Sequence, residues 1–134
     1  MPATFVAPRW LVAVKNLQDL HVLVVEDEAI IGMLLEDVLI DIGCKTVDVM
    51  SSVEAALTYL EDQKVDFALL DINLNGRLSF PVAEQLQTKA IPFIFLSGYG
   101  AQGLTGPYSR CKTLQKPFQP GEIEKAVGEA LMAV

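Results

Sequence analysis

The sequence is poor in the residues from which many catalytic and metal sites are built. Among its 134 residues there are two cysteines and one histidine. Neither Cys44 nor Cys111 belongs to a Cys-x-x-Cys or Cys/His pattern, which excludes the usual zinc and dithiol sites. The single histidine, His21, has no nucleophile or ligand pattern around it. The two separated thiols are typical of a protein kept in a reducing compartment.

Long apolar runs and clusters of basic residues are also missing. The longest apolar run near the N-terminus, Leu11 to Val14, is far too short to span a bilayer, and no signal-peptide pattern surrounds it. We therefore expect a cytoplasmic protein with no membrane partner. Ten lysines and arginines against seventeen acidic residues give a net charge of −7, which argues against a nucleic-acid partner.

The chain has the length of one domain and is 51% hydrophobic, enough to bury one substantial core. From His21 onward, short apolar runs alternate with segments of helical periodicity, which is typical of an α/β fold with a doubly wound parallel sheet. We expect a domain over 21–134 that acts alone, preceded by an N-terminal extension over 1–20. The extension is either a disordered leader or a short helix around Trp10 to Leu20 that packs on the domain or on a second copy.

The hydrophobic pattern predicts where the individual elements lie. The predicted strands cover 21–25, 45–50, 67–70, 92–96 and 113–115. The predicted helices cover 28–42, a segment from 53, 81–89 and a segment from 120. Ser51 and Glu54 match a capping box at the start of the second helix. Four glycines and a proline between Gly98 and Pro107 disfavour a regular fourth helix, so we expect a loop or one irregular turn there.

Several polar residues follow these strands directly. Glu26 and Asp27 come after the first strand, and Asp71 comes after the third. Because the carboxyl ends of parallel strands form the ligand crevice of such a sheet, these carboxylates should converge. Adjacent carboxylates repel each other unless a cation is near, and oxygen-only clusters suit Mg²⁺ or Mn²⁺. We predict that Asp27 and Asp71 bind the metal directly, that Glu26 acts through a water, and that the backbone carbonyl of Asn73 is a further ligand.

Ser97 follows the fourth strand and Lys116 follows the last one, so both should reach the same crevice. An aspartate beside a metal can attack phosphorus and become an acyl phosphate. Asp71 is the predicted phosphoacceptor. Lys116 would supply a positive charge for the phosphoryl oxygens, and Ser97 would supply a hydroxyl donor.

This arrangement resembles the receiver domain of two-component response regulators over about residues 21–132. The resemblance rests on Val24-Val25-Glu26-Asp27-Glu28, Leu69-Leu70-Asp71, Ser97-Gly98 and Lys116-Pro117-Phe118, each placed after a strand. It implies a flavodoxin-like (βα)5 fold and Mg²⁺ dependence. It also implies that a histidine kinase or a histidine phosphotransfer protein phosphorylates Asp71 in a phosphorelay, and that a partner protein reads the resulting change. A cis peptide bond between Lys116 and Pro117 follows mainly from the same resemblance.

The sequence departs from the family pattern at one position of interest. Receivers usually carry an aromatic switch residue three positions before the lysine, where this chain has Thr113. The segment from Phe95 to Gly100 looks like the variant found in the FATGUY receiver subfamily, whose segment after the fourth strand is rich in glycine. Tyr99 could therefore take over the switching role.

Three functional classes fit these residues. The leading hypothesis is a phosphoacceptor signalling domain, not an enzyme beyond its own phosphotransfer and dephosphorylation, that acts through contact with an unknown downstream protein. The alternatives are a receiver-fold module that binds partners without phosphorylation, and a small phosphohydrolase using Asp71. The phosphohydrolase is weakened because Asp71-Ile72-Asn73 is an imperfect D-x-D motif. The sequence leaves open whether the protein forms a homodimer.

Overall fold

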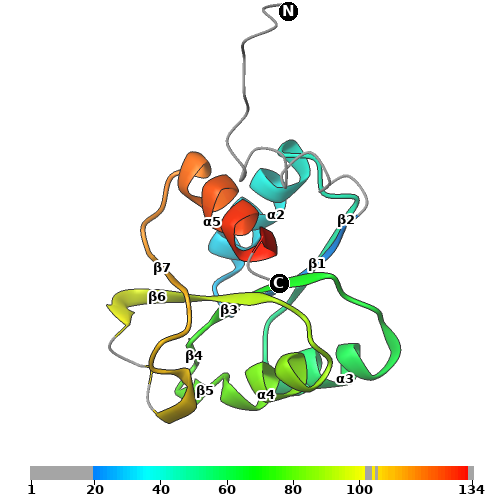
Figure 1. Cartoon of the computed structure of the whole chain (residues 1–134), viewed down its shortest axis with the longest axis vertical. Helices are drawn as coiled ribbons and strands as arrows, with labels where there is room; N and C mark the ends of the chain where they lie inside the picture. The colour runs from blue at the N-terminus through cyan, green and yellow to red at the C-terminus, as the bar shows by residue number, and fades with distance from the viewer. Residues whose placement is uncertain (1–19, 102–103, 105, 133–134) are drawn as a thin grey trace, which may run out of the picture.

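The computed structural model describes residues 20–101, 104 and 106–132. Five parallel strands form one sheet in the order β2-β1-β3-β6-β7. This is the 2-1-3-4-5 order of the flavodoxin-like fold, so the predicted fold class is confirmed. Helices α2 and α5 cover one face of the sheet, and α3 and α4 cover the other (Figure 1). The bounds of the sheet strands are His21–Val25 for β1, Thr46–Met50 for β2, Phe67–Asp71 for β3, Phe93–Ala101 for β6 and Thr113–Gln115 for β7.

The four α-helices of the described residues lie close to the predicted ranges. Their bounds are Ala29–Asp41 for α2, Val53–Asp62 for α3, Phe80–Thr88 for α4 and Pro120–Met132 for α5. None of these helices is long and apolar enough to cross a membrane. Residues 1–19 lie outside the described part of the chain, so the two alternatives for the N-terminal extension stay predictions.

The core is divided into two layers by the sheet. Side chains of a strand alternate between its faces, so Val22 and Val24 of β1 pack on the α2 and α5 side, while Leu23 and Val25 pack on the α3 and α4 side. Every residue of β3 is buried, as expected for the central strand of a sheet that is covered on both faces. The position of β3 places Asp71, its last residue, at the middle of the carboxyl edge.

The segment between β3 and α4 is more regular than the loop expected from the sequence. Asn73–Leu74 (β4) pairs antiparallel with Arg77–Leu78 (β5) in a small hairpin. Asn75 and Gly76 form its turn with φ angles of 54° and 87°, and two positive φ angles are typical of a type I′ hairpin turn. The hairpin closes because the Ser79 N–H donates to the Ile72 carbonyl at 2.9 Å.

Between β6 and β7, where the sequence predicts no regular helix, the only helical segment among the described residues is the 3₁₀ helix Gly106–Tyr108 (η2). Gly106 has a φ of 57°, a left-handed conformation that glycine adopts without strain. The prediction of one irregular turn is therefore confirmed. Strand β6, by contrast, runs to Ala101 and so extends beyond the predicted end at Leu96.

The predicted capping box at α3 was wrong by one residue. Ser52, and not Ser51, is the N-cap: the Ala55 N–H donates to its Oγ at 3.1 Å. Glu54 consequently stands at the second helical position, one short of the place from which a capping-box glutamate reaches back to the N-cap. The error arose because two adjacent serines offer the same local signal, and the packing of Val53 in the core decides between them.

This assignment predicts different effects for the two serines. Ser52→Ala should lower the free energy of unfolding by about 1 kcal/mol, since it leaves an N-terminal N–H of α3 without its partner. The exposed Ser51→Ala is the matched control and should change stability by less than about 0.5 kcal/mol. Urea unfolding of the two variants measures the difference, and equal effects would contradict the assignment.

Candidate functional site

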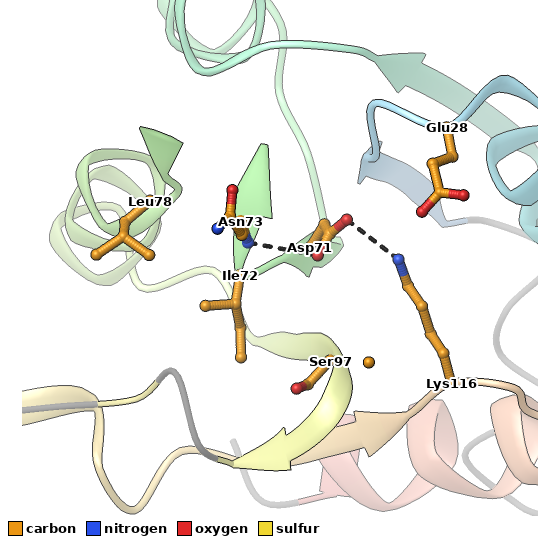
Figure 2. A pocket seen from close by; sticks show the side chains of 8 residues that line it. Glu28, Asp71, Ile72, Asn73, Leu78, Ser97 and Lys116 are labelled. Atoms are coloured by element: carbon orange, nitrogen blue, oxygen red, sulfur yellow. Dashed lines mark hydrogen bonds and ion pairs between the residues drawn. The ribbon is translucent and has the colours of Figure 1, made fainter. Parts of the chain in front are cut away.

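The carboxyl ends of the strands form a pocket that contains most of the predicted site residues. The pocket has a volume of about 480 Å³. It is lined by Asp71 at the end of β3, Ser97 in β6 and Lys116 directly after β7, together with Glu28, Ile72, Asn73, Leu78 and Gly98 (Figure 2). Residues that are far apart in the sequence meet here because parallel strands bring their carboxyl ends to one edge.

Lys116 links two buried carboxylates. Its Nζ lies 2.6 Å from Glu26 Oε1 and 3.1 Å from Asp71 Oδ2, and Figure 2 shows the side chain reaching toward Asp71. Glu26 is 1% exposed and Asp71 is 7% exposed, so water screens these contacts weakly. Burial alone would lower the pKa of Lys116, but its two carboxylate partners raise that pKa above its usual range. The lysine therefore stays charged at neutral pH.

Glu26 has an unusual protonation equilibrium. Burial, and next the neighbouring Asp71 carboxylate, raise its pKa to about 8, although Lys116 acts in the opposite direction. Its second oxygen, Oε2, is buried and has no hydrogen-bond partner among the described residues. A buried carboxylate oxygen without a partner is costly, and a cation would relieve that cost.

Glu26, Asp27 and Asp71 form a cluster that could hold a metal ion. Each offers one carboxylate oxygen, and these oxygens all lie within 4.8 Å of one another. An oxygen-only donor set with several carboxylates suits Mg²⁺ or Mn²⁺, which keep waters in their remaining positions. Together with the unpartnered Oε2 of Glu26, this donor set fits the predicted ion.

Two finer predictions about the ligand set stay predictions. One is that Glu26 binds through a water. The other is that Asn73 contributes its carbonyl oxygen: Asn73 lines the pocket, and its backbone N–H donates to Asp71 Oδ1 at 3.4 Å (Figure 2). That contact places the start of the hairpin directly beside the predicted phosphoacceptor.

The pocket is also lined by residues to which the sequence assigned no role. Glu28 lines the pocket, and only its position directly after Glu26-Asp27 could have suggested it. Leu78 lines the pocket from the hairpin and is 44% exposed, which no sequence signal indicates.

Two positions matter for the predicted switch residue, Thr113 and Tyr99. Thr113 lies in β7, where its hydroxyl donates to the Cys111 carbonyl at 3.2 Å. The side chain of Tyr99, the predicted substitute switch, lies outside the described residues.

The acidic cluster predicts a measurable response to Mg²⁺. At a Mg²⁺ concentration about 100 times its dissociation constant, the ion should stabilise the protein by about 2.7 kcal/mol. Asp27→Asn should lose most of this gain, because it removes one of the three clustered carboxylates. Asp62→Asn, at an exposed position at the end of α3, is the control and should respond like the parent protein. Thermal unfolding with and without Mg²⁺ measures the gain; an undiminished gain in Asp27→Asn would contradict the predicted site.

A flavodoxin-like sheet with clustered carboxylates, a hydroxyl and a lysine at its carboxyl edge defines a receiver-type signalling domain. The chain belongs to the response regulator receiver domain family, whose model matches residues 22–128. It is 32% identical over 115 residues to the phyllosphere-induced regulator PhyR of Methylorubrum extorquens, a match that covers 83% of this chain and 43% of PhyR. The chain spans less than half the length of the curated relatives it matches.

Among solved structures, the chain is similar to SdrG from Sphingomonas melonis Fr1. The solution structure of SdrG has a TM-score of 0.76 and 38% identity, and the match covers 86% of this chain and 98% of SdrG. The BeF3-activated conformation of SdrG, from Pseudomonas melonis Fr1, has a TM-score of 0.72 and 37% identity, with 88% of this chain and 98% of that one covered. The predicted receiver family is thus confirmed, while membership of the FATGUY subfamily stays a prediction.

Proposed function

We propose that Asp71 accepts a phosphoryl group from a histidine kinase or a histidine phosphotransfer protein, and that the domain signals this state by protein contact within a phosphorelay. The observation that carries the proposal is the position of the Asp71 carboxylate. It lies in an open pocket, 3.1 Å from the Lys116 ammonium and within the cluster of three carboxylates. Such a group is both activated and supplied with positive charge for an incoming phosphoryl group.

The proposed transfer uses each of these residues in turn. A carboxylate oxygen of Asp71 attacks the phosphorus atom, an O–P bond forms, and the N–P bond to the donor histidine breaks with its electron pair left on the imidazole nitrogen. Lys116 balances the charge of the phosphoryl oxygens, and the Ser97 hydroxyl lies in the same pocket to donate to them. Mg²⁺ or Mn²⁺, held by Asp27, Asp71 and Glu26, would neutralise developing charge on the phosphoryl group.

The experiment that tests the proposal uses acetyl phosphate with Mg²⁺, because a small phosphodonor does not need a docking surface. The protein should gain the mass of one phosphoryl group, and Asp71→Asn should not. Asp62→Asn is the matched control, because it removes an exposed aspartate outside the pocket and should leave the adduct unchanged. An adduct that persists in Asp71→Asn would refute the assignment of the phosphoacceptor.

An apolar surface beside the pocket supports a protein as the phosphodonor. Ile30 and Met33 of α2 are 82% and 63% exposed, which is unusual for large apolar side chains at adjacent turns of one helix face. Next to them, Ile31, Leu34, Pro117 and Phe118 line an apolar cavity of about 240 Å³ that also contacts Lys116. A helix of the donor packed here would bring its histidine to the rim of the site, as in other helix-in-groove complexes.

The proposed downstream partner is also a protein. A net charge of −7 disfavours nucleic acid as the partner. We therefore propose that the phosphorylated form acts by changing its affinity for another polypeptide.

The proposed location of the protein is the cytoplasm. Cys44 and Cys111 are free thiols, in agreement with this location.

A further inference from the structure

An aromatic residue anchors the segment that follows β6. Tyr108 is the last residue of the 3₁₀ helix η2, directly follows the region where a regular helix was not expected, and is 8% exposed. Leu104, in the same region, is buried in the same core cluster on the α3 and α4 side of the sheet. Among the described residues of the segment between β6 and β7, Leu104 and Tyr108 are therefore the ones buried in this core cluster.

Tyr108 makes two ring contacts and one hydrogen bond. Its ring stacks on that of Phe80, with centroids 4.7 Å apart and an interplanar angle of 25°. It meets Phe95 edge to face, with centroids 6.0 Å apart. Its hydroxyl donates to the Phe80 carbonyl at 3.4 Å, a long hydrogen bond. Phe80 and Phe95 also contact each other edge to face, so the three rings form one packed group.

Phe80 is connected to the phosphoacceptor through the hairpin. It is the first residue of α4 and directly follows Ser79, whose N–H bonds to the carbonyl of Ile72, the neighbour of Asp71. At the start of the same hairpin, the Asn73 N–H donates to Asp71 Oδ1. Two hydrogen bonds and a short, closed length of chain therefore connect the Asp71 carboxylate to Phe80.

Phe95 is connected to the other side of the site. It lies two residues before Ser97 in β6, and it pairs with Leu70, the residue before Asp71, in the sheet. Phe95 is fully buried, and protein interiors are packed so closely that a shift of β6 near Ser97 moves the rings in contact with it. Tyr108 thus contacts α4, which follows the hairpin, and β6, which pairs with the end of β3.

We propose that Tyr108 is the positioning residue that couples phosphorylation of Asp71 to the segment Gly106–Cys111. This inference rests on the proposed function. A phosphoryl group on Asp71 adds bulk and charge where Asn73 and Ser97 lie, so the hairpin and β6 both adjust. The Tyr108 ring, packed against Phe80 and Phe95, follows them and carries η2 with it. Thr113, at the position where receivers usually carry an aromatic switch residue, has no ring to perform this role.

The test uses the full chain with Mg²⁺ and beryllofluoride as a phosphoryl analogue, followed by amide chemical shifts in NMR spectra. Asn73 and Ser97 report on the site, while Tyr108, Ser109 and Cys111 report on the segment. Both groups of signals should shift in the parent protein. In Tyr108→Leu the site signals should shift as before, but the segment response should fall by about threefold or more, the scale of change produced by residues that carry coupling. Tyr108→Phe keeps the stacked ring and should retain the response.

The matched control is Tyr59→Leu, which removes a tyrosine of α3 that contacts His21 and Asp48 and has no ring contact with Phe80, Phe95 or Tyr108. Its segment response should equal that of the parent protein. Phe80→Leu removes the opposite ring of the stack and should reproduce Tyr108→Leu, which keeps the test decisive if one variant does not fold. A full segment response in a folded Tyr108→Leu or Phe80→Leu variant would overturn the proposal. So would a parent protein whose site signals shift while the segment signals do not. If even the site signals do not shift, the proposed function itself fails.

Discussion

Replacing Lys116 with methionine is expected to lower the free energy of unfolding by about 3–5 kcal/mol at pH 8.5 without Mg²⁺, the usual cost of removing one partner from a buried ion pair. The substitution leaves Glu26 and Asp71 buried without the ammonium that now contacts both. It should also slow phosphorylation by acetyl phosphate on the order of 10²-fold, because it removes a charged donor from the proposed path of the phosphoryl oxygens. Urea unfolding and mass spectrometry measure the two effects.

Lys112→Met is the matched control for this prediction. Lys112 pairs with Glu129 at 2.7 Å, but both side chains are about 40% exposed, and pairs of this kind contribute less than about 1 kcal/mol. The control should therefore change stability little and phosphorylation not at all. Equal destabilisation by the two substitutions would show that the buried carboxylates do not depend on Lys116.

The metal-free protein is expected to lose stability as the pH rises from about 5 to about 8. The pKa of Glu26 is raised to about 8 in the folded protein, from 4.5 for an ordinary glutamate. Between these values the folded state binds more protons than the unfolded state, so stability falls with increasing pH. Below pH 4.5 Glu26 is mostly protonated in both states, and the loss of stability is absent. Above pH 8 Glu26 is ionised in both states, and the loss of stability is complete. Its size is on the order of a few kcal/mol, since one unit of pKa shift corresponds to about 1.4 kcal/mol.

Glu26→Gln separates this effect from other titrations, because glutamine has nearly the same shape and no charge. The variant should be more stable than the parent protein at pH 8.5, and its stability should depend less on pH between 5 and 8. Urea unfolding at several pH values, with a metal chelator present, provides the measurement. The result that contradicts the assignment is a parent protein whose stability stays constant or rises across this range. Mg²⁺ binding near pH 7 should also release a proton from the parent protein, because the ion requires the carboxylate form.

The strands and the main site residues could be predicted from the sequence because both depend on strong local signals. A continuous apolar run such as Phe67 to Leu70 is long enough to define a buried strand, and the polar residue that follows it marks the strand's carboxyl end. The parallel topology then brings Asp71 and Lys116 together without further information. Between β6 and β7 the described residues form no regular α-helix, and this was predictable for a similar reason, because several glycines oppose a helix at once.

What the sequence did not reveal depends on packing between distant elements. Ser51 and Ser52 carry the same local capping signal, and only the burial of Val53 distinguishes them. The contact between Phe80 and Tyr108 joins residues 28 positions apart, and no periodicity or motif indicates it. Glu28 belongs to the motif that follows β1, but its place in the pocket wall depends on how α2 begins.

The sheet separates the two surfaces that the proposed activity uses. The apolar residues of α2 and the neighbouring Phe118 lie over one core layer, whereas Phe80, Phe95 and Tyr108 belong to the other. Substitutions that change which phosphodonor is recognised therefore need not disturb the rings proposed to transmit the response. A lineage that duplicated this gene could exchange its upstream partner while keeping its downstream one, and a protein engineer could rewire the same pathway by altering a single helix.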